Sequence, residues 1–154
     1  MDKDGGRQEA GGERNAIDRG PLENVFGFLL RAAWRDSARV FAKYFRSLDI
    51  NPQQYATLVL ISRNPGCATG DLTEPLGVTA NNIVRLIETL SERGLVEKTV
   101  DAADRRVRLL RLTDEGTAFL ARLFEIHEHY DAEFREKLGA DNIDRLCEIL
   151  HRFD

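Results

Sequence analysis

Four arginines fall within seven positions of the chain, from Arg105 to Arg111, in the stretch DAADRRVRLLRLTDEG. Guanidinium groups bind phosphate through paired N–H donors, so a cluster of this kind is suited to a polyanion. The protein as a whole is acidic, with 22 basic and 26 acidic side chains in 154 residues and a formal net charge of −4. The positive charge is therefore local, and the neighbouring elements determine what it contacts.

The residues upstream of this cluster predict a helix with one apolar and one polar face. Thr79 is suited to cap its N-terminus, and Gly94 lies where a C-terminal glycine is expected. Four aliphatic residues follow the i, i+3, i+4, i+7 spacing of a buried helix face: Ile83, Leu86, Ile87 and Leu90.

The polar side chains in the first two turns of this helix are of types that read nucleic-acid bases. They are Thr79, Asn81, Asn82 and Arg85. Amide groups pair with the major-groove edge of adenine, and guanidinium groups pair with guanine. On the helix alone, an ordinary solvent-facing surface explains these residues equally well, so the next segment has to distinguish the two interpretations.

Two β-rich stretches after the helix favour the nucleic-acid interpretation. GLVEKTV and VRLLRLT are joined by the polar loop DAADRR, which predicts a hairpin with Leu110 and Leu112 facing inward and Arg111 outward. A helix, a turn at Gly77-Val78, a second helix and this hairpin make a winged helix-turn-helix. The second helix fits a major groove, and the hairpin reaches the backbone or the minor groove. Acidity elsewhere is compatible with this, since charge is screened beyond about 8–10 Å at physiological salt.

These motifs resemble those of the MarR (multiple antibiotic resistance regulator) family of transcriptional regulators. The resemblance covers about residues 22–153 and is most specific in RLIETLSERGLVEK and DAADRRVRLLRLTDEG, which are similar to the family's recognition helix, wing and start of the next helix. It implies a symmetric homodimer, built from the first and the last two helices, that binds a palindromic operator in double-stranded DNA. Pro75, in the short helix before the recognition helix, departs from the pattern and predicts a kinked or shortened helix.

The contacts to DNA are then expected on the recognition helix and at the hairpin tip: Thr79, Asn81, Asn82, Arg85, Asp104, Arg105 and Arg106. At the tip, we expect one arginine to reach the DNA while an aspartate orients the other. The expected function is that of a sequence-specific regulator, a repressor released from DNA by a small ligand. An alternative is a protein-interaction module that keeps the dimer fold without binding DNA specifically.

The expected fold class is mainly α-helical with a small β-wing: a winged helix-turn-helix flanked by long N- and C-terminal dimerisation helices. Residues 1–20 are rich in glycine and poor in large apolar residues, which predicts a disordered tail. We expect a dimerisation helix over 21–50, the DNA-binding lobe over 51–113 and further dimerisation helices over 114–154. The apolar stripes at both ends exceed what one small domain can cover, and a second copy would cover them.

An effector site is expected where the first helix meets the lobe, because the family that the chain resembles often binds small anionic or aromatic compounds there. Trp34 offers a stacking surface, Arg31 or Arg35 a carboxylate partner, and Tyr44 and Tyr55 hydroxyl donors. This set is suited to a phenolic or aryl acid. In the alternative interpretation Trp34 fills the core and the arginines face solvent.

The sequence argues against an enzyme and against a metal site. It contains no glycine-rich phosphate loop, nucleophile elbow or convincing acid–base pair, so we expect no catalytic residues and no cofactor. His127 with Asp131, and His129 with Glu133, have the i, i+4 spacing of helical metal ligands. The two pairs point in different directions, however, and His127 lies in an apolar stripe, so no metal is expected.

No apolar run approaches the length of a membrane span, and the N-terminal residues lack the apolar stretch that is typical of a signal peptide. A cytoplasmic location is therefore expected. Cys67 and Cys147 are far apart in the sequence and are interpreted as two ordinary thiols.

Overall fold

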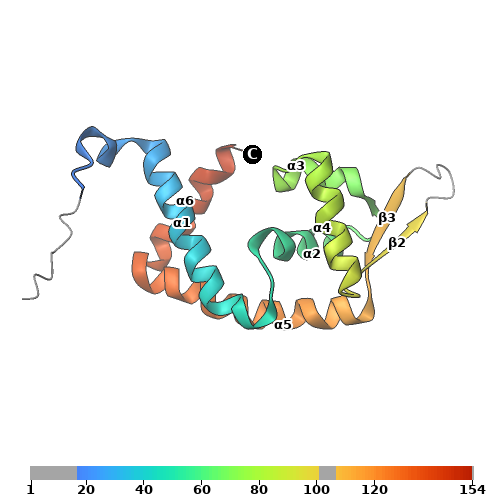
Figure 1. Ribbon diagram of the computed structural model, residues 1–154. Coiled ribbons are helices and arrows are strands. Elements are labelled where there is room, and N and C mark those ends of the chain that lie inside the picture. The colour runs from blue at the N-terminus through green and yellow to red at the C-terminus, as the bar shows by residue number, and fades with distance from the viewer. Residues whose placement is uncertain (1–16, 101–106, 154) are drawn as a thin grey trace, which may run out of the picture. The chain divides into compact units, whose positions relative to one another are not determined.

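The computed structural model describes residues 17–100 and 107–153, which are mainly helical (Figure 1). The chain divides into two compact units, the first ending at Arg35 and the second beginning at Asp36. No helix within the described ranges is both long enough and apolar enough to cross a lipid bilayer.

The first unit holds a short 3-10 helix and the first part of a long α-helix, namely η1 (Gly20–Asn24) and α1 (Phe26–Phe45). The second unit holds the rest of α1 and all further elements. In chain order these are η2 (Arg46–Leu48), α2 (Pro52–Arg63), β1 (Cys67–Ala68), η3 (Thr69–Leu72), α3 (Thr73–Leu76), α4 (Ala80–Glu92), β2 (Val96–Val100), β3 (Arg108–Leu112), α5 (Asp114–Leu138), α6 (Ala140–Leu150) and η4 (His151–Phe153). The predicted fold class, mainly α-helical with a small β-wing on a winged helix-turn-helix, is confirmed.

Side chains cap the starts of α2 and α5. The Asn51 side chain accepts a hydrogen bond from the Gln54 N–H at 2.9 Å, and the Gln54 side chain accepts one from the Asn51 N–H at 3.0 Å. This reciprocal pair fixes the start of α2. At α5, the Thr113 hydroxyl accepts from the Gly116 N–H at 2.9 Å.

The first helix is shorter than the segment 21–50 that the sequence predicts. Val25 has extended backbone angles, with φ −84° and ψ 115°, so the residues before it form the separate 3-10 helix η1. After α1 the chain tightens into η2 and reverses at Asp49, whose φ is +46°. The apolar periodicity continues through these breaks, and for that reason periodicity alone could not locate them.

A three-stranded antiparallel sheet has the order β1-β3-β2. In the hairpin, Val96 pairs with Leu112 and Val100 with Arg108. Leu110 is fully buried and Arg111 is exposed, as the alternation predicts. The two-residue strand β1 was not predicted, because so short a strand carries no periodic signal.

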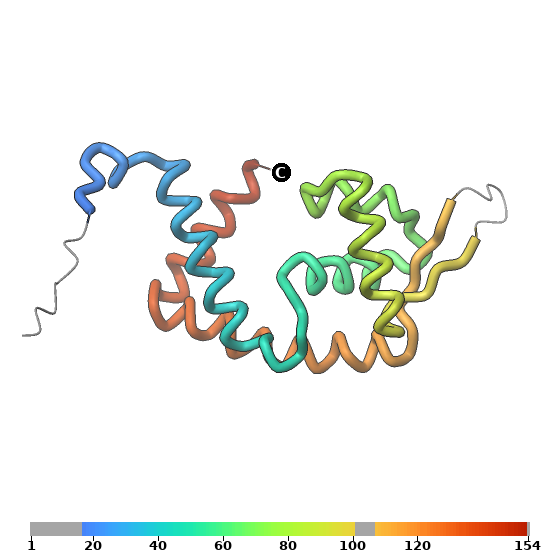
Figure 2. The backbone as a smooth tube through the Cα atoms, viewed as in Figure 1, coloured from blue at the N-terminus to red at the C-terminus, as the bar shows by residue number. Residues whose placement is uncertain are grey.

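The core lies between α2, α4, α5 and the sheet. α5 begins at the end of β3 and runs past α2, which it contacts (Figure 2). The largest fully buried hydrophobic side chains come from each of these elements and from the end of α1: Phe45, Leu58, Ile61, Ile83, Ile87, Leu90, Leu110 and Leu123. This core holds α4 and the hairpin in fixed positions.

Candidate nucleic-acid interface

α3 and α4 form the helix-turn-helix. α3 is four residues long and includes Pro75, which has no N–H to donate, in keeping with the predicted shortening. Gly77 has a φ of +60°, a left-handed conformation that glycine adopts without strain, and its N–H donates to the Glu74 carbonyl at 3.0 Å. The chain therefore reverses sharply before α4.

Both ends of α4 are capped. The Thr79 hydroxyl accepts from the Asn82 N–H at 3.4 Å, a long hydrogen bond at the helix start. At the other end Gly94 has a φ of +71°, and the Leu95 N–H donates to the Leu90 carbonyl at 3.0 Å. This is the Schellman arrangement that the sequence predicts.

The two faces of α4 differ in exposure. On the inner face, Ile83, Ile87 and Leu90 are at most 2% exposed. The four predicted contact residues of the outer face, Thr79, Asn81, Asn82 and Arg85, are all exposed and lie together in the first two turns. The side chains of Asn81, Asn82 and Arg85 form no hydrogen bond with any residue of the described ranges. Their donors and acceptors are therefore available to an external partner.

Asp104, Arg105 and Arg106 lie outside the described residues. The strands that lead to the tip are described, and both carry exposed cations, Lys98 on β2 and Arg108 on β3.

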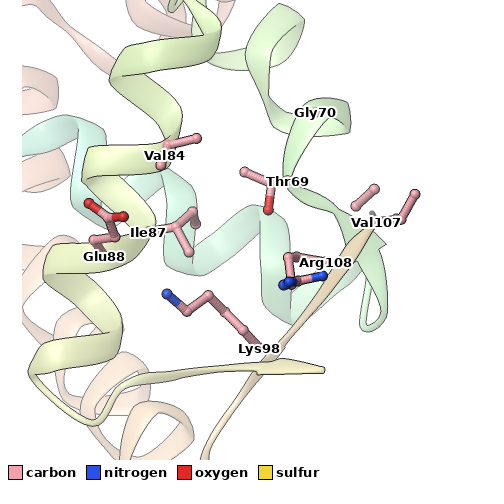
Figure 3. Close-up of a pocket in the computed structure, with 9 residues that line it drawn as sticks. Thr69, Gly70, Val84, Ile87, Glu88, Lys98, Val107 and Arg108 are labelled. Atoms are coloured by element: carbon pink, nitrogen blue, oxygen red, sulfur yellow. The ribbon is translucent and has the colours of Figure 1, made fainter. Parts of the chain in front are cut away.

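A recess of about 560 Å³ lies between α4, the start of η3 and the hairpin (Figure 3). α4 contributes Val84, Ile87 and Glu88 to its wall, while Lys98 and Arg108 belong to the hairpin. In Figure 3, Arg108 lies beside Thr69, and Lys98 extends from its strand towards α4. Two cations and one carboxylate thus line the space between the polar helix and the wing.

Neither Lys98 nor Arg108 is among the contact residues that the sequence predicts, although Arg108 belongs to the arginine cluster between Arg105 and Arg111. The pairing of Lys98 with Leu110, and of Val100 with Arg108, places both cations on the same face of the hairpin. Because Leu110 faces inward, the alternation in VRLLRLT by itself places Arg108 on the inner face. That alternation is the signal that could have identified Arg108.

The predicted effector residues fall into both units. Arg31, Trp34 and Arg35 belong to the first unit and are exposed, and Trp34 has an exposed fraction of 66%. The alternative that Trp34 fills the core of the chain is therefore wrong.

The two predicted tyrosines lie in the second unit and have different environments. The Tyr44 hydroxyl donates to Glu133 at 2.8 Å, and this hydrogen bond raises the pKa of Tyr44. Tyr55 is partly buried and stacks on His127, with ring centroids 5.4 Å apart, and burial raises the pKa of its phenol. Both side chains are thus neutral donors near neutral pH.

The carboxylates of the two histidine pairs bind cations of the protein. Asp131 accepts from Arg135 at 2.5 Å, and Glu133 accepts from Lys43 at 2.7 Å. Within the described ranges, no group of three or more histidine, cysteine, aspartate or glutamate side chains could hold a metal ion.

A capped helix with exposed amide and guanidinium groups, a tight turn before it and a hairpin with basic strands define a winged helix-turn-helix DNA-binding protein. The MarR family model matches residues 48–107. The chain is 31% identical over 104 residues to the transcriptional regulator HosA of Escherichia coli O157:H7, an alignment that covers 68% of this chain and 77% of HosA. The chain belongs to the MarR family, whose members are transcriptional regulators and not enzymes.

Solved structures agree with this assignment. The chain is similar to the transcriptional repressor CouR bound to a 23-mer DNA duplex, with 30% identity, a TM-score of 0.85 and coverage of 90% of this chain and 98% of CouR. It is also similar to CouR bound to p-coumaroyl-CoA, with 28% identity, a TM-score of 0.82 and coverage of 90% and 97%.

Proposed function

We propose that this transcriptional regulator is a repressor that binds a palindromic operator as a homodimer and is released by a small aromatic or phenolic ligand. The observation that carries the proposal is the first two turns of α4, where the side chains of Asn81, Asn82 and Arg85 are exposed and form no hydrogen bond within the described part of the chain. A similar repressor, CouR, has been solved on a DNA duplex.

The chemistry of α4 supports base recognition. A capped helix presents side chains from a rigid backbone, and amide and guanidinium groups distinguish adenine and guanine in the major groove. Lys98 and Arg108, which are exposed on β2 and β3, are proposed as contacts to the DNA backbone. Arg105 and Arg106 at the hairpin tip are proposed as further contacts, with Asp104 orienting one of them.

Exposed apolar side chains support the homodimer. In the first unit, Leu29 and Leu30 of α1 are 47% and 43% exposed. In the second unit, Leu146 and Ile149 of α6 are 44% and 40% exposed. Contiguous apolar faces of this kind mark protein–protein interfaces, and a two-fold dimer requires operator half-sites about 10–10.5 base pairs apart.

The effector proposal rests on Trp34 with Arg31 or Arg35, and on the phenols of Tyr44 and Tyr55. The exposed indole of Trp34 can stack on an aromatic ring, and a guanidinium can pair with a carboxylate. CouR has been solved with an aromatic acyl thioester, p-coumaroyl-CoA. A ligand that binds the free dimer more tightly than the DNA-bound form releases the DNA by linkage.

The DNA proposal is tested with Arg85→Ala on a selected operator and on random DNA. We expect Arg85→Ala to cost about 1–3 kcal/mol on the operator and to relax base preference at one symmetric pair of positions. Arg63→Ala, which removes an exposed arginine at the end of α2, is the matched control and should bind as wild type. If Arg85→Ala lost equal affinity for the operator and for random DNA, Arg85 would contact only phosphate and not a base.

Salt dependence separates this proposal from the protein-interaction alternative. For a DNA-binding regulator, affinity for DNA falls steeply with salt, and replacing Arg105 and Arg106 by Ala lowers the slope by about one unit for each phosphate that the variant no longer binds. A dimer that shows no salt-dependent retention on DNA would favour the interaction module. Sedimentation as a monomer at micromolar concentration would contradict the dimer.

A thermal-shift screen of aryl acids tests the effector site. We expect at least one phenolic acid to raise the melting temperature, and Trp34→Ala to remove that shift. A hit that Trp34→Ala leaves unchanged would place the ligand elsewhere.

A further inference from the structure

A second recess, of about 790 Å³, lies at the end of α4 that is remote from the proposed base contacts. It is lined by the last turns of α1, by η2 and the start of α2, and by the end of α4. The lining residues used below are Arg39, Lys43, Arg46, Asp49 and Arg93, together with Ile50. Its volume falls within the range of about 300–1,000 Å³ that is typical of small-molecule sites.

The lining is strongly basic. The lining contains four cationic residues, Arg39, Lys43, Arg46 and Arg93, and one acidic residue, Asp49. This concentration of positive charge stands out in an acidic chain with a net charge of −4. Converging cations with fixed donors are the chemistry that binds phosphate.

The cationic side chains of this recess differ in whether they already form ion pairs or hydrogen bonds with other residues of the protein. Arg39 pairs with Asp36 at 2.6 Å and Lys43 with Glu133 at 2.7 Å, and both cations are well exposed. Exposed ion pairs contribute little and exchange readily with other anions. The Arg46 side chain forms no ion pair or hydrogen bond with any residue that the structure describes. It is therefore the cation most available to a ligand.

Arg93, one of the lining residues, is held in place by contacts with other parts of the protein. Its guanidinium donates to the Asp49 carbonyl at 2.7 Å and to the Leu48 carbonyl at 3.0 Å, and it lies 5.3 Å from the ring centre of Phe119. These contacts tie η2 to the end of α4. The start of α2, capped by Asn51 and Gln54, adds the positive end of a twelve-residue helix dipole.

We propose that this recess binds a small molecule that carries a diphosphate or an equivalent pair of phosphates. DNA fits the position less well, because α4 runs from α3 to the start of α5 and the proposed base-reading residues occupy its opposite end (Figure 1). The volume exceeds that of a phosphate alone, and the buried side chain of Ile50 supplies an apolar contact for an attached group. The proposal does not depend on the repressor function proposed above.

The test is calorimetric titration of the full chain with sodium diphosphate at constant ionic strength, with sulfate as the comparison anion. We expect saturable binding of diphosphate, stronger than that of sulfate. Arg46→Gln should weaken it on the order of tenfold, since it removes one charge-assisted contact. Arg39→Gln should weaken it less, because Asp36 already neutralises part of that charge.

The matched control is Arg122→Gln, which removes an exposed arginine of α5 that lies outside this recess. It should change diphosphate affinity by less than about twofold, the scatter expected for a remote surface charge. Equal weakening by Arg46→Gln and Arg122→Gln, or no saturable binding by the wild type, would overturn the proposal. If Arg46→Gln leaves diphosphate binding intact but weakens binding to duplex DNA, the recess belongs to the DNA interface and the proposal is wrong.

Discussion

The DNA-binding lobe and the last helix, α6, both have regular apolar patterns. Of the two, only the lobe buries its apolar side chains within the same chain. Leu58 in α2 and Leu90 in α4 are fully buried. α6 contains no buried residue, although Leu146, Ile149 and Leu150 recur along one side of it. The same kind of apolar periodicity therefore marks a buried face in the lobe and a face without buried residues in α6.

The difference teaches what an amphipathic pattern specifies. Periodicity identifies the apolar face of a helix, whereas tertiary packing decides whether the same chain covers that face. In the lobe, the helices and the sheet pack against one another and bury their apolar side chains. In α6, much of the surface of Leu146 and Ile149 remains for another partner, which is the basis of the proposed dimer.

The largest effect is expected from Gly116→Ala, which adds a methyl group where the backbone of Gly116 lies close to that of Leu95. A Cβ at Gly116 would lie 2.0 Å from the Leu95 carbonyl oxygen, so two backbone segments have to separate. We expect a loss of about 4 kcal/mol in the free energy of unfolding, measured by urea denaturation. Gly27→Ala is the control, since nothing lies within 4 Å of its Cβ, and it should be neutral or slightly stabilising.

Leu90→Ala and Ile149→Ala compare the two regions directly. Leu90 is fully buried, so we expect its truncation to cost about 3 kcal/mol. Ile149 is 40% exposed, and its truncation should cost less than about 1 kcal/mol at a protein concentration where the chain is monomeric. Equal losses under those conditions would mean that α6 packs as tightly as the lobe, and the comparison would fail.

Thr113→Ala tests the hydroxyl that starts α5. This hydroxyl accepts from the Gly116 N–H and donates to the Gly94 carbonyl at 2.6 Å. Its removal should cost about 1–2 kcal/mol, the upper range for a helix cap. Thr113→Ser keeps both hydrogen bonds and should restore most of the loss, whereas a similar loss in Thr113→Ser would assign the effect to the methyl group.

The smallest effect concerns Glu133, in the half of α5 beyond the lobe. Hydrogen bonds from Lys43 and then from Tyr44 hold the pKa of Glu133 below its usual value. A lowered folded-state pKa favours the carboxylate, so the stabilisation is present above the unfolded pKa of about 4.3 and is lost as the pH falls through the folded pKa. Glu133→Gln should therefore lose less stability than wild type between about pH 6 and pH 3 in thermal melts. Identical pH profiles would show that the contact contributes nothing.

The parts of the fold that the sequence predicts are those with local causes. Asn51 and Gln54 are three residues apart and cap each other, and Gly94 ends α4 where the periodicity stops. The outer face of α4 follows from helical geometry once Ile83 and Ile87 are placed inside. These features require no knowledge of the rest of the chain.

The parts that were missed depend on contacts between distant residues. β1 exists because Cys67 pairs with Leu110, and Tyr44 is engaged because Glu133, 89 residues later, lies within 2.8 Å. No local pattern encodes either contact. The basic recess at Arg46 and Arg93 likewise forms only when α1, α2 and α4 are brought together.

The Thr113 junction also has a mechanical consequence. Its hydroxyl and its N–H bind the Gly94 and Leu95 carbonyls, at 2.6 and 3.2 Å, and the close approach of Gly116 leaves no slack between them. The end of α4 and the start of α5 are thus held rigidly together, and α5 extends for 25 residues from this point. A tilt of α5 by about 5° at its start moves its far end by about 3 Å. A small displacement of the far end of α5 is therefore transmitted to α4, the helix that carries Arg85.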